Sequence, residues 1–137
     1  MKTAIYVRVS TVDKGQSPEM QKNELKEFCE SKGFDIGYVF EDTASGKTMN
    51  RPGLQSLLEV ARAKGFEVLV FWKLDRMFRS QRDAINTLYE LSTLDIKYIS
   101  LKDPEFNSTT PYGKMLLGIL STFAEFESGM ISERVKS

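Results

Sequence analysis

The sequence predicts an α/β domain, in which a mostly parallel sheet of four to five strands has helices on both faces and is followed by a long C-terminal helix. Three observations support this fold class. Segments with strand patterns and helix patterns alternate along the chain. Residues 68–72 form a continuous apolar run, which is typical of a central strand covered on both faces. Residues 112–137 keep a helical pattern throughout.

The chain opens with a predicted β-α-β unit. Residues 2–9 and 34–41 are rich in β-branched and aromatic residues, which favour strands. Residues 17–32 lie between them and place apolar side chains at helical spacing, and Gly33 is a natural C-terminal stop for this helix. The polar stretch 42–50 then predicts a loop.

Two further helices and two further strands complete the predicted core, which we expect to span residues 1–110. Asn50 can cap a helix that has Pro52 in its first turn and ends at Gly65. The remaining predicted elements are a strand at 67–73, a helix at about 80–94, a strand at 96–101 and a loop or short edge strand at 103–111.

The last predicted element is a helix that is too long for the domain. Residues 112–137 would span about 39 Å at the helical rise per residue, which exceeds the width of a domain of this size. One apolar stripe can pack on the core and the other would need a second chain, unless the helix breaks at Gly129 and covers itself. The stripes are Met115, Ile119, Phe123, Phe126 and Met130, and Leu116, Leu117, Leu120, Ala124, Ile131 and Val135. We expect residues 111–137 to mediate oligomerisation. The interface residues expected are Leu116, Leu120, Phe123, Phe126, Met130 and Ile131.

The composition excludes several classes of chemistry. The chain has no histidine, which excludes Ser-His-Asp hydrolysis and histidine-ligated metal sites. Its single cysteine, Cys29, leaves too few soft ligands for structural zinc, and we expect it to be a small buried hydrophobe. No apolar segment approaches the roughly 20 residues that cross a bilayer, so we expect a cytoplasmic protein with no membrane partner. With 19 basic and 19 acidic residues, only local charge can favour nucleic acid.

Cationic and hydroxyl side chains gather where the first and third predicted strands end. Arg8 and Ser10 lie at the carboxyl end of the first strand, where open α/β sheets bind ligands. Between residues 73 and 82 four cations and one acid give a local net charge of +3. Arg76 and Arg79 are three residues apart, and two guanidinium groups on one helix face suit a phosphate. Alternatively, Ser10 caps a turn, Arg8 pairs with an acid and the charge run is a solvated face.

Without histidine, a serine nucleophile would have to be activated by electrostatics. Arginines can lower the cost of forming an alkoxide and can stabilise a pentacoordinate phosphoryl transition state. A loop containing Ser45 and Gly46 leads to Arg51 at a predicted helix start, which adds a cation to the group. Asp75 could orient an arginine or could be an ordinary helix cap. The candidate constellation is Ser10, Arg8, Arg51, Arg76 and Arg79.

Four motifs follow one another along the chain: Tyr6-Val7-Arg8-Val9-Ser10-Thr11, Asp42-x-x-Ser45-Gly46, Arg51-Pro52-x-Leu54 and Lys73-Leu74-Asp75-Arg76-x-x-Arg79. In order and approximate spacing they resemble the motifs of the serine site-specific recombinases, the family of resolvases, DNA invertases and large integrases. Residues 118–127 resemble the start of the long helix of that family, although Ser128 stands where the family commonly has an arginine. The resemblance covers essentially the whole chain and corresponds to the catalytic domain.

The resemblance implies that Ser10 attacks a DNA phosphodiester and forms a 5′-phosphoserine link, before strands are exchanged and rejoined. It implies that the four arginines of the constellation bind the phosphate, that Asp75 supports them and that Tyr6 is structural. Supporting residues by motif position are Gln16, Gln21, Ser45 and Glu127. The implied partners are double-stranded DNA and further copies of the chain, as a dimer and as a tetramer on DNA. The covalent link retains the bond energy, so the resemblance implies no metal and no small-molecule cofactor.

Two other functions compete with the recombinase hypothesis. A non-catalytic doubly wound domain could bind a small phosphorylated ligand with the same arginines, although no glycine-rich phosphate loop is present. An assembly module could use the long helix for oligomerisation alone. The sequence contains no motif that reads DNA bases, and in the resembled family such modules follow the long helix, so we expect them beyond residue 137.

Overall fold

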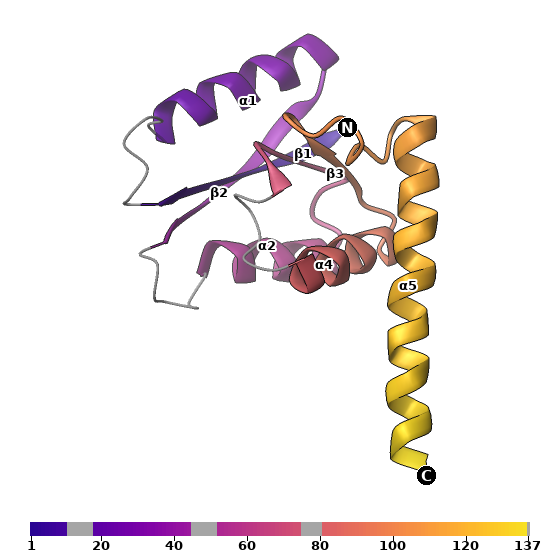
Figure 1. Ribbon diagram of the computed structural model, residues 1–137. Coiled ribbons are helices and arrows are strands. Elements are labelled where there is room, and N and C mark those ends of the chain that lie inside the picture. The colour runs from indigo at the N-terminus through magenta and orange to yellow at the C-terminus, as the bar shows by residue number, and fades with distance from the viewer. Residues whose placement is uncertain (11–17, 45–51, 75–80, 137) are drawn as a thin grey trace.

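The computed structural model describes the backbone of residues 1–10, 18–44, 52–74 and 81–136, and side chains within 1–8, 19–43, 52–74 and 84–126. In this part of the chain, four parallel strands form one sheet in the order β2-β1-β3-β4 (Figure 1). The strands are β1 (Lys2–Ser10), β2 (Asp35–Ala44), β3 (Val68–Phe71) and β4 (Lys97–Ser100). The predicted α/β class with a parallel sheet is therefore confirmed.

Helices cover both faces of the sheet, as a parallel sheet requires. In Figure 1 helices lie on either side of the sheet, and the long C-terminal helix runs alongside and extends past them. The helix on the first face is α1 (Pro18–Lys32). The helices on the second face are α2 (Pro52–Arg62) and α4 (Gln81–Thr93), and the long helix is α5 (Pro111–Lys136).

Each face of the sheet has its own hydrophobic core, and the alternation of β1 separates them. Ala4 and Tyr6 belong to the core shared with α2 and α4, whereas Ile5 and Val7 belong to the core shared with α1. The apolar run of residues 68–72 is buried throughout, as predicted for a central strand. Cys29 is fully buried in the α1 core, which confirms the prediction for it, and burial raises the pKa of its thiol to about 11.

The helix ends agree with the sequence in one case and differ in another. Gly33 has a φ of 71° after α1, as expected for a glycine stop. After α2, however, the left-handed residue is Lys64, with a φ of 57°, and the N–H of Gly65 donates to the Val60 carbonyl at 2.9 Å. Gly65 is required for space instead, because a Cβ there would lie 2.4 Å from Val60 Cγ1. The helix ends at Arg62 and the left-handed residue after it is Lys64, so the prediction that Gly65 itself terminates the helix is wrong.

The long helix continues without a break through Gly129, so the alternative of a helix broken at that glycine is wrong. Its first apolar stripe is exposed within the described side chains, while Ala124 of the second stripe is buried and the leucines beside it are half-buried. The exposed residues are Tyr112, Met115, Ile119, Phe123 and Phe126, each more than half exposed. The Tyr89 hydroxyl of α4 donates to Glu125 Oε1 at 3.2 Å, which marks the packed side. No helix in the described part of the chain is long and apolar enough to cross a membrane.

Two glycines of α5 test how tightly its start is packed. A Cβ on Gly113 would lie 1.7 Å from the Asn107 carbonyl oxygen, whereas Gly118 has nothing within 4 Å. We expect Gly113→Ala to lower the free energy of unfolding by about 2 kcal/mol or more through overpacking. Gly118→Ala should raise it by up to about 1 kcal/mol through helix propensity. Urea unfolding followed by circular dichroism measures both, and effects of the same sign and size would contradict this packing.

Candidate functional site

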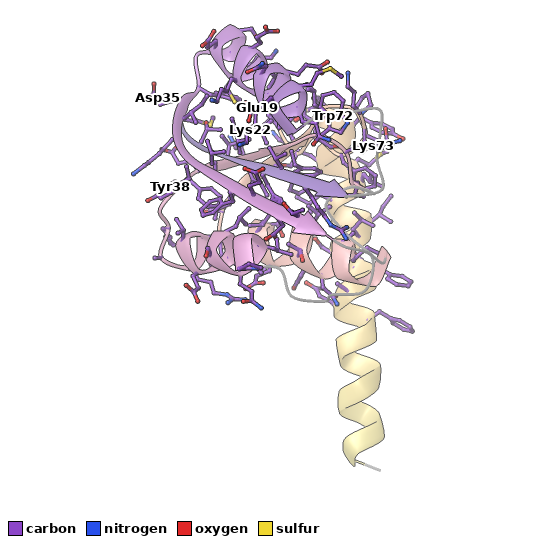
Figure 2. All side chains as sticks on the ribbon, turned by 90° about the vertical axis from the view of Figure 1, so that its left-hand side faces the viewer. Glu19, Lys22, Asp35, Tyr38, Trp72 and Lys73 are labelled. Atoms are coloured by element: carbon purple, nitrogen blue, oxygen red, sulfur yellow. The ribbon has the colours of Figure 1, made fainter. Side chains whose placement is uncertain are left out.

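Two of the predicted site residues, Arg8 and Ser10, lie on β1 near the carboxyl edge of the sheet. β1 ends at Ser10 and β2 ends at Ala44, and these two residues are paired in register. β3 ends at Phe71 in the same direction, and Trp72 and Lys73 follow it. In Figure 2, Trp72 and Lys73 lie on the side toward which the strand arrowheads point, and Asp35 at the start of β2 lies on the opposite side. This edge is where an open parallel sheet places its ligand.

Arg8 and Ser10 are the predicted residues that β1 brings to this edge. Arg8 is paired in register with Asp42, and its side chain is half-buried. Ser10 is the last residue of the strand, two positions further on, so its Cα lies about 7 Å from that of Arg8. The side chain of Ser10 lies outside the described ones. Also outside the described residues are Gln16, Ser45, Arg51, Asp75, Arg76 and Arg79. For Glu127, Met130 and Ile131 only the helical backbone is described.

Gln21, a predicted supporting residue, lies on α1 and has an unusual environment. Its side chain is only 2% exposed, and its Oε1 is buried with no hydrogen-bond partner among the described residues. A buried acceptor without a donor costs about 1–3 kcal/mol, and such groups are worth a functional explanation.

Asp42 organises the start of α2, a role that the sequence analysis missed. Its Oδ1 accepts a hydrogen bond from the Gly53 N–H at 2.7 Å, and its Oδ2 accepts from the Leu54 N–H at 2.9 Å and from the Tyr6 hydroxyl at 2.7 Å. The carboxylate is 5% exposed. A negative group at a helix N-terminus satisfies its free N–H groups and interacts favourably with its dipole. The network fixes α2 immediately after Arg51 in sequence.

Gly53 makes this capping contact possible. A Cβ at that position would lie 2.8 Å from Asp42 Oδ1 and 2.6 Å from the Glu41 carbonyl oxygen. The cap joins residues 11 positions apart, so no local capping pattern in the sequence reveals it. In the sequence, the one indication that Asp42 and Tyr6 matter is that both belong to the motifs that resemble the family. The expectation that Tyr6 is structural agrees with its position in this network.

Ion pairs fasten α1 to the sheet beside the same edge. Lys22 Nζ lies 2.7 Å from Glu41 Oε2 and 3.8 Å from Glu19 Oε1. The hydrogen bond to Glu41 is the main reason that the pKa of Lys22 is raised. Figure 2 shows Glu19 and Lys22 side by side on α1. Within the described residues, no group of three or more cysteines and carboxylates could hold a metal ion.

Comparison with known proteins assigns the family. The family model described as "Resolvase, N terminal domain" matches residues 3–137. The chain belongs to the serine recombinases of this resolvase family. It is 39% identical over 132 residues to a DNA-invertase of Escherichia phage P1, and the alignment covers 96% of this chain and 65% of that relative. The chain therefore spans about two thirds of the length of its curated relative.

Solved structures of the resolvase family have the same fold. The N-terminal catalytic domain of TP901-1 integrase has a TM-score of 0.79 and is 32% identical, with 95% of this chain and 98% of that chain covered. A resolvase family site-specific recombinase from Streptococcus pneumoniae has a TM-score of 0.74 and is 26% identical, with 99% and 93% covered. The predicted resemblance to serine recombinases is confirmed, and so is the predicted fold.

The Asp42 network gives a stability prediction with an internal control. Asp42→Ala removes the acceptor of two helix N–H groups and one hydroxyl, so we expect the free energy of unfolding to fall by about 3 kcal/mol. Tyr6→Phe removes one hydroxyl bond and keeps both helix caps, and should cost about 1 kcal/mol. Chemical denaturation of the two variants measures this difference. Equal losses would show that Asp42 does not hold α2.

Proposed function

We propose that this chain is the catalytic domain of a serine recombinase or integrase that cleaves and rejoins double-stranded DNA with Ser10 as the nucleophile. The observation that carries the proposal is the position of Ser10, which ends β1 at the carboxyl edge of a parallel sheet. Membership of the resolvase family supports it. Arg51, Asp75, Arg76 and Arg79 follow β2 or β3 in sequence, and both of these strands run parallel to β1 and end at the same edge.

The proposed reaction is a pair of transesterifications. Ser10 Oγ loses its proton and bonds to the phosphorus of a DNA phosphodiester, the bond from phosphorus to the 3′-oxygen breaks, and that oxygen takes up a proton. The products are a 5′-phosphoserine link and a free 3′-hydroxyl. Attack by a 3′-hydroxyl on the phosphoserine reverses every bond change and rejoins the strand, so the reaction needs no external energy source.

Positive charge would supply the catalysis in this chemistry. Arg8, half-buried beside the end of β1, and Arg51, which precedes the capped start of α2, would hold the phosphate oxygens. Arg76 and Arg79 would add charge as it develops in the transition state, with Asp75 supporting them. Gln16, Gln21, Ser45 and Glu127 would have supporting roles. The buried amide oxygen of Gln21, which has no hydrogen-bond partner among the described residues, supports its place near the site.

The proposed partners are DNA and further copies of the chain. Within its described side chains, α5 presents a stripe of large apolar residues to solvent, with Phe126 63% exposed and Ile119 58% exposed. A second copy would remove this stripe from water. We therefore propose residues 1–110 as the catalytic core and residues 111–137 as the oligomerisation helix, with a dimer that assembles into a tetramer on DNA. Base-reading modules in the complete protein would select the target.

The second candidate function, binding of a small phosphorylated ligand, would use the same arginines without a covalent step. The structure offers no observation that favours it over DNA. The two functions differ at Ser10, because a binding site tolerates the loss of one hydroxyl whereas a covalent mechanism does not.

Replacing the nucleophile tests the proposal directly. The complete reading frame is expressed as wild type and as Ser10→Ala in cells that carry its native element, and DNA attached covalently to the protein is recovered under denaturing conditions. We expect adducts at discrete sites with the wild type and none above background with Ser10→Ala, because no oxygen remains at residue 10 to bond to phosphorus.

A matched serine variant controls for expression and folding. Ser31→Ala removes an exposed hydroxyl whose one partner among the described residues is the Phe28 carbonyl within α1, at 2.7 Å, and should give wild-type adducts. Adducts that persist in Ser10→Ala would contradict the role of Ser10. The absence of adducts from a well-expressed wild type would favour the phosphate-binding module.

A further inference from the structure

We propose that Asp103 is a positioning residue for the segment that carries Asp75, Arg76 and Arg79, and that it acts by holding the backbone of Leu74. The proposal rests on the proposed function, because that segment matters for catalysis only if its side chains act on a phosphate. Asp103 lies outside all four family motifs and is not among the predicted site residues. Asp103 follows β4, which lies on the other side of β3 from β1, the strand that ends at Ser10.

The carboxylate of Asp103 makes two hydrogen bonds with one oxygen. Its Oδ2 accepts from the Leu74 N–H at 2.8 Å and from the Ser100 hydroxyl at 2.8 Å. Ser100 is the last residue of β4 and is only 2% exposed, so its hydroxyl fixes the carboxylate from the sheet. The backbone of Asp103 is fixed as well, because its carbonyl accepts the Phe106 N–H at 2.9 Å. The acceptor is therefore oriented independently of Leu74.

Asp103 provides a hydrogen bond between the segments that follow β3 and β4, beyond the backbone bonds that pair them. The Leu101 N–H donates to the Phe71 carbonyl at 2.9 Å, and the Lys102 N–H donates to the Trp72 carbonyl at 3.0 Å. Further along these two segments, the Leu74 N–H donates to the carboxylate of Asp103. A charged acceptor makes a stronger bond than a backbone carbonyl. The attachment to β4 thus reaches to within one residue of Asp75 and two residues of Arg76, and two residues span at most about 7 Å.

A second contact holds the same segment from the side. Lys102 Nζ lies 4.6 Å from the centroid of the Trp72 ring and 3.3 Å from Glu24 Oε2 on α1. The indole is only 7% exposed, so this cation covers one of its faces at the surface of the domain. Residues 101–103 therefore hold residues 71–74 through backbone bonds, a ring and a carboxylate. Of these three residues, Asp103 is the one that holds Leu74, the residue directly before Asp75.

This arrangement predicts a defect in the chemical step without a defect in DNA binding. In cells carrying the complete reading frame and its native element, Asp103→Ala should lower covalent adduct formation on the order of 10- to 100-fold, because small misplacement of catalytic groups has effects of this size. Noncovalent occupancy of the same sites, measured by formaldehyde crosslinking, should stay within about twofold, since ground-state binding is retained. Loss of folded protein would lower both quantities together.

Two conservative variants separate the two hydrogen bonds of the carboxylate. Asp103→Asn keeps an oxygen that can accept the Leu74 N–H, so we expect it to recover most of the adduct formation. Ser100→Ala removes the other bond to the same oxygen and leaves the Leu74 bond in place, so it should stay within about threefold of the wild type, as expected for a single neutral hydrogen bond. A loss in Ser100→Ala as large as in Asp103→Ala would overturn the proposal.

Amide hydrogen exchange of the purified protein tests the anchor without any activity. Exchange at the Leu74 amide should accelerate in Asp103→Ala and stay slow in Ser100→Ala. Unchanged exchange in Asp103→Ala would refute the anchor, and so would wild-type adduct formation by that variant. If the wild type itself forms no adducts, the proposed function fails and the catalytic role of Asp103 fails with it, while the exchange result still decides whether Asp103 holds Leu74.

Discussion

The structure depends on how a parallel sheet ends. Where β1, β2 and β3 stop at the carboxyl edge, the chain must leave the hydrogen-bond ladder, and the N–H groups of the following residues lose their strand partners. Buried or half-buried carboxylates meet that need at two of the connections. Asp42 holds the first N–H groups of α2, and Asp103 holds the N–H of Leu74 after β3. The residues that these carboxylates hold adjoin predicted site residues in sequence, because Gly53 follows Arg51 by two positions and Leu74 directly precedes Asp75.

The scaffold could be predicted from the sequence because its signals are local. The apolar run at 68–72, the strand-like composition of residues 2–9 and the glycine after α1 each depend on neighbouring residues only. The structure changes the boundaries mainly where pairing decides them. Residues 34–41 were predicted as a strand, whereas β2 runs from Asp35 to Ala44 because it stays in register with β1 up to Ser10. The possible edge strand at 103–111 is reduced to a single antiparallel bridge between Ile99 and Asn107.

The polar contacts that hold the site could not be predicted in the same way. The hydroxyl of Tyr6 meets Asp42 across 36 residues of sequence, and Leu74 meets Asp103 across 29. Such contacts depend on which strands are neighbours, and no pattern within one segment contains that information. The resemblance to the family motifs identified Arg8, Ser10 and the later arginines of the constellation, because a family pattern keeps the order of its residues. It gave no signal for Asp103, which stands outside the quoted motifs.

One side of the long helix packs against the rest of the domain, whereas large apolar side chains on its other side are exposed. Ala124 is buried, whereas Phe123, its neighbour in sequence, is 53% exposed. The tight start of the helix at Gly113, against the carbonyl of Asn107, sets its direction relative to the core. Asp103 lies in the connection that leads from β4 into this helix, so the residue that holds Leu74 and the start of α5 belong to the same stretch of chain.

The central claim is that one side chain, that of Ser10, becomes bonded to DNA. The most direct measurement is to trap the protein–DNA adduct made by the complete protein, digest both components and identify the modified residue by mass spectrometry. The account predicts a nucleotide attached through its 5′-phosphate to Ser10, with a free 3′-hydroxyl on the other side of the break in the same strand. Attachment to any other residue, or through a 3′-phosphate, would contradict it.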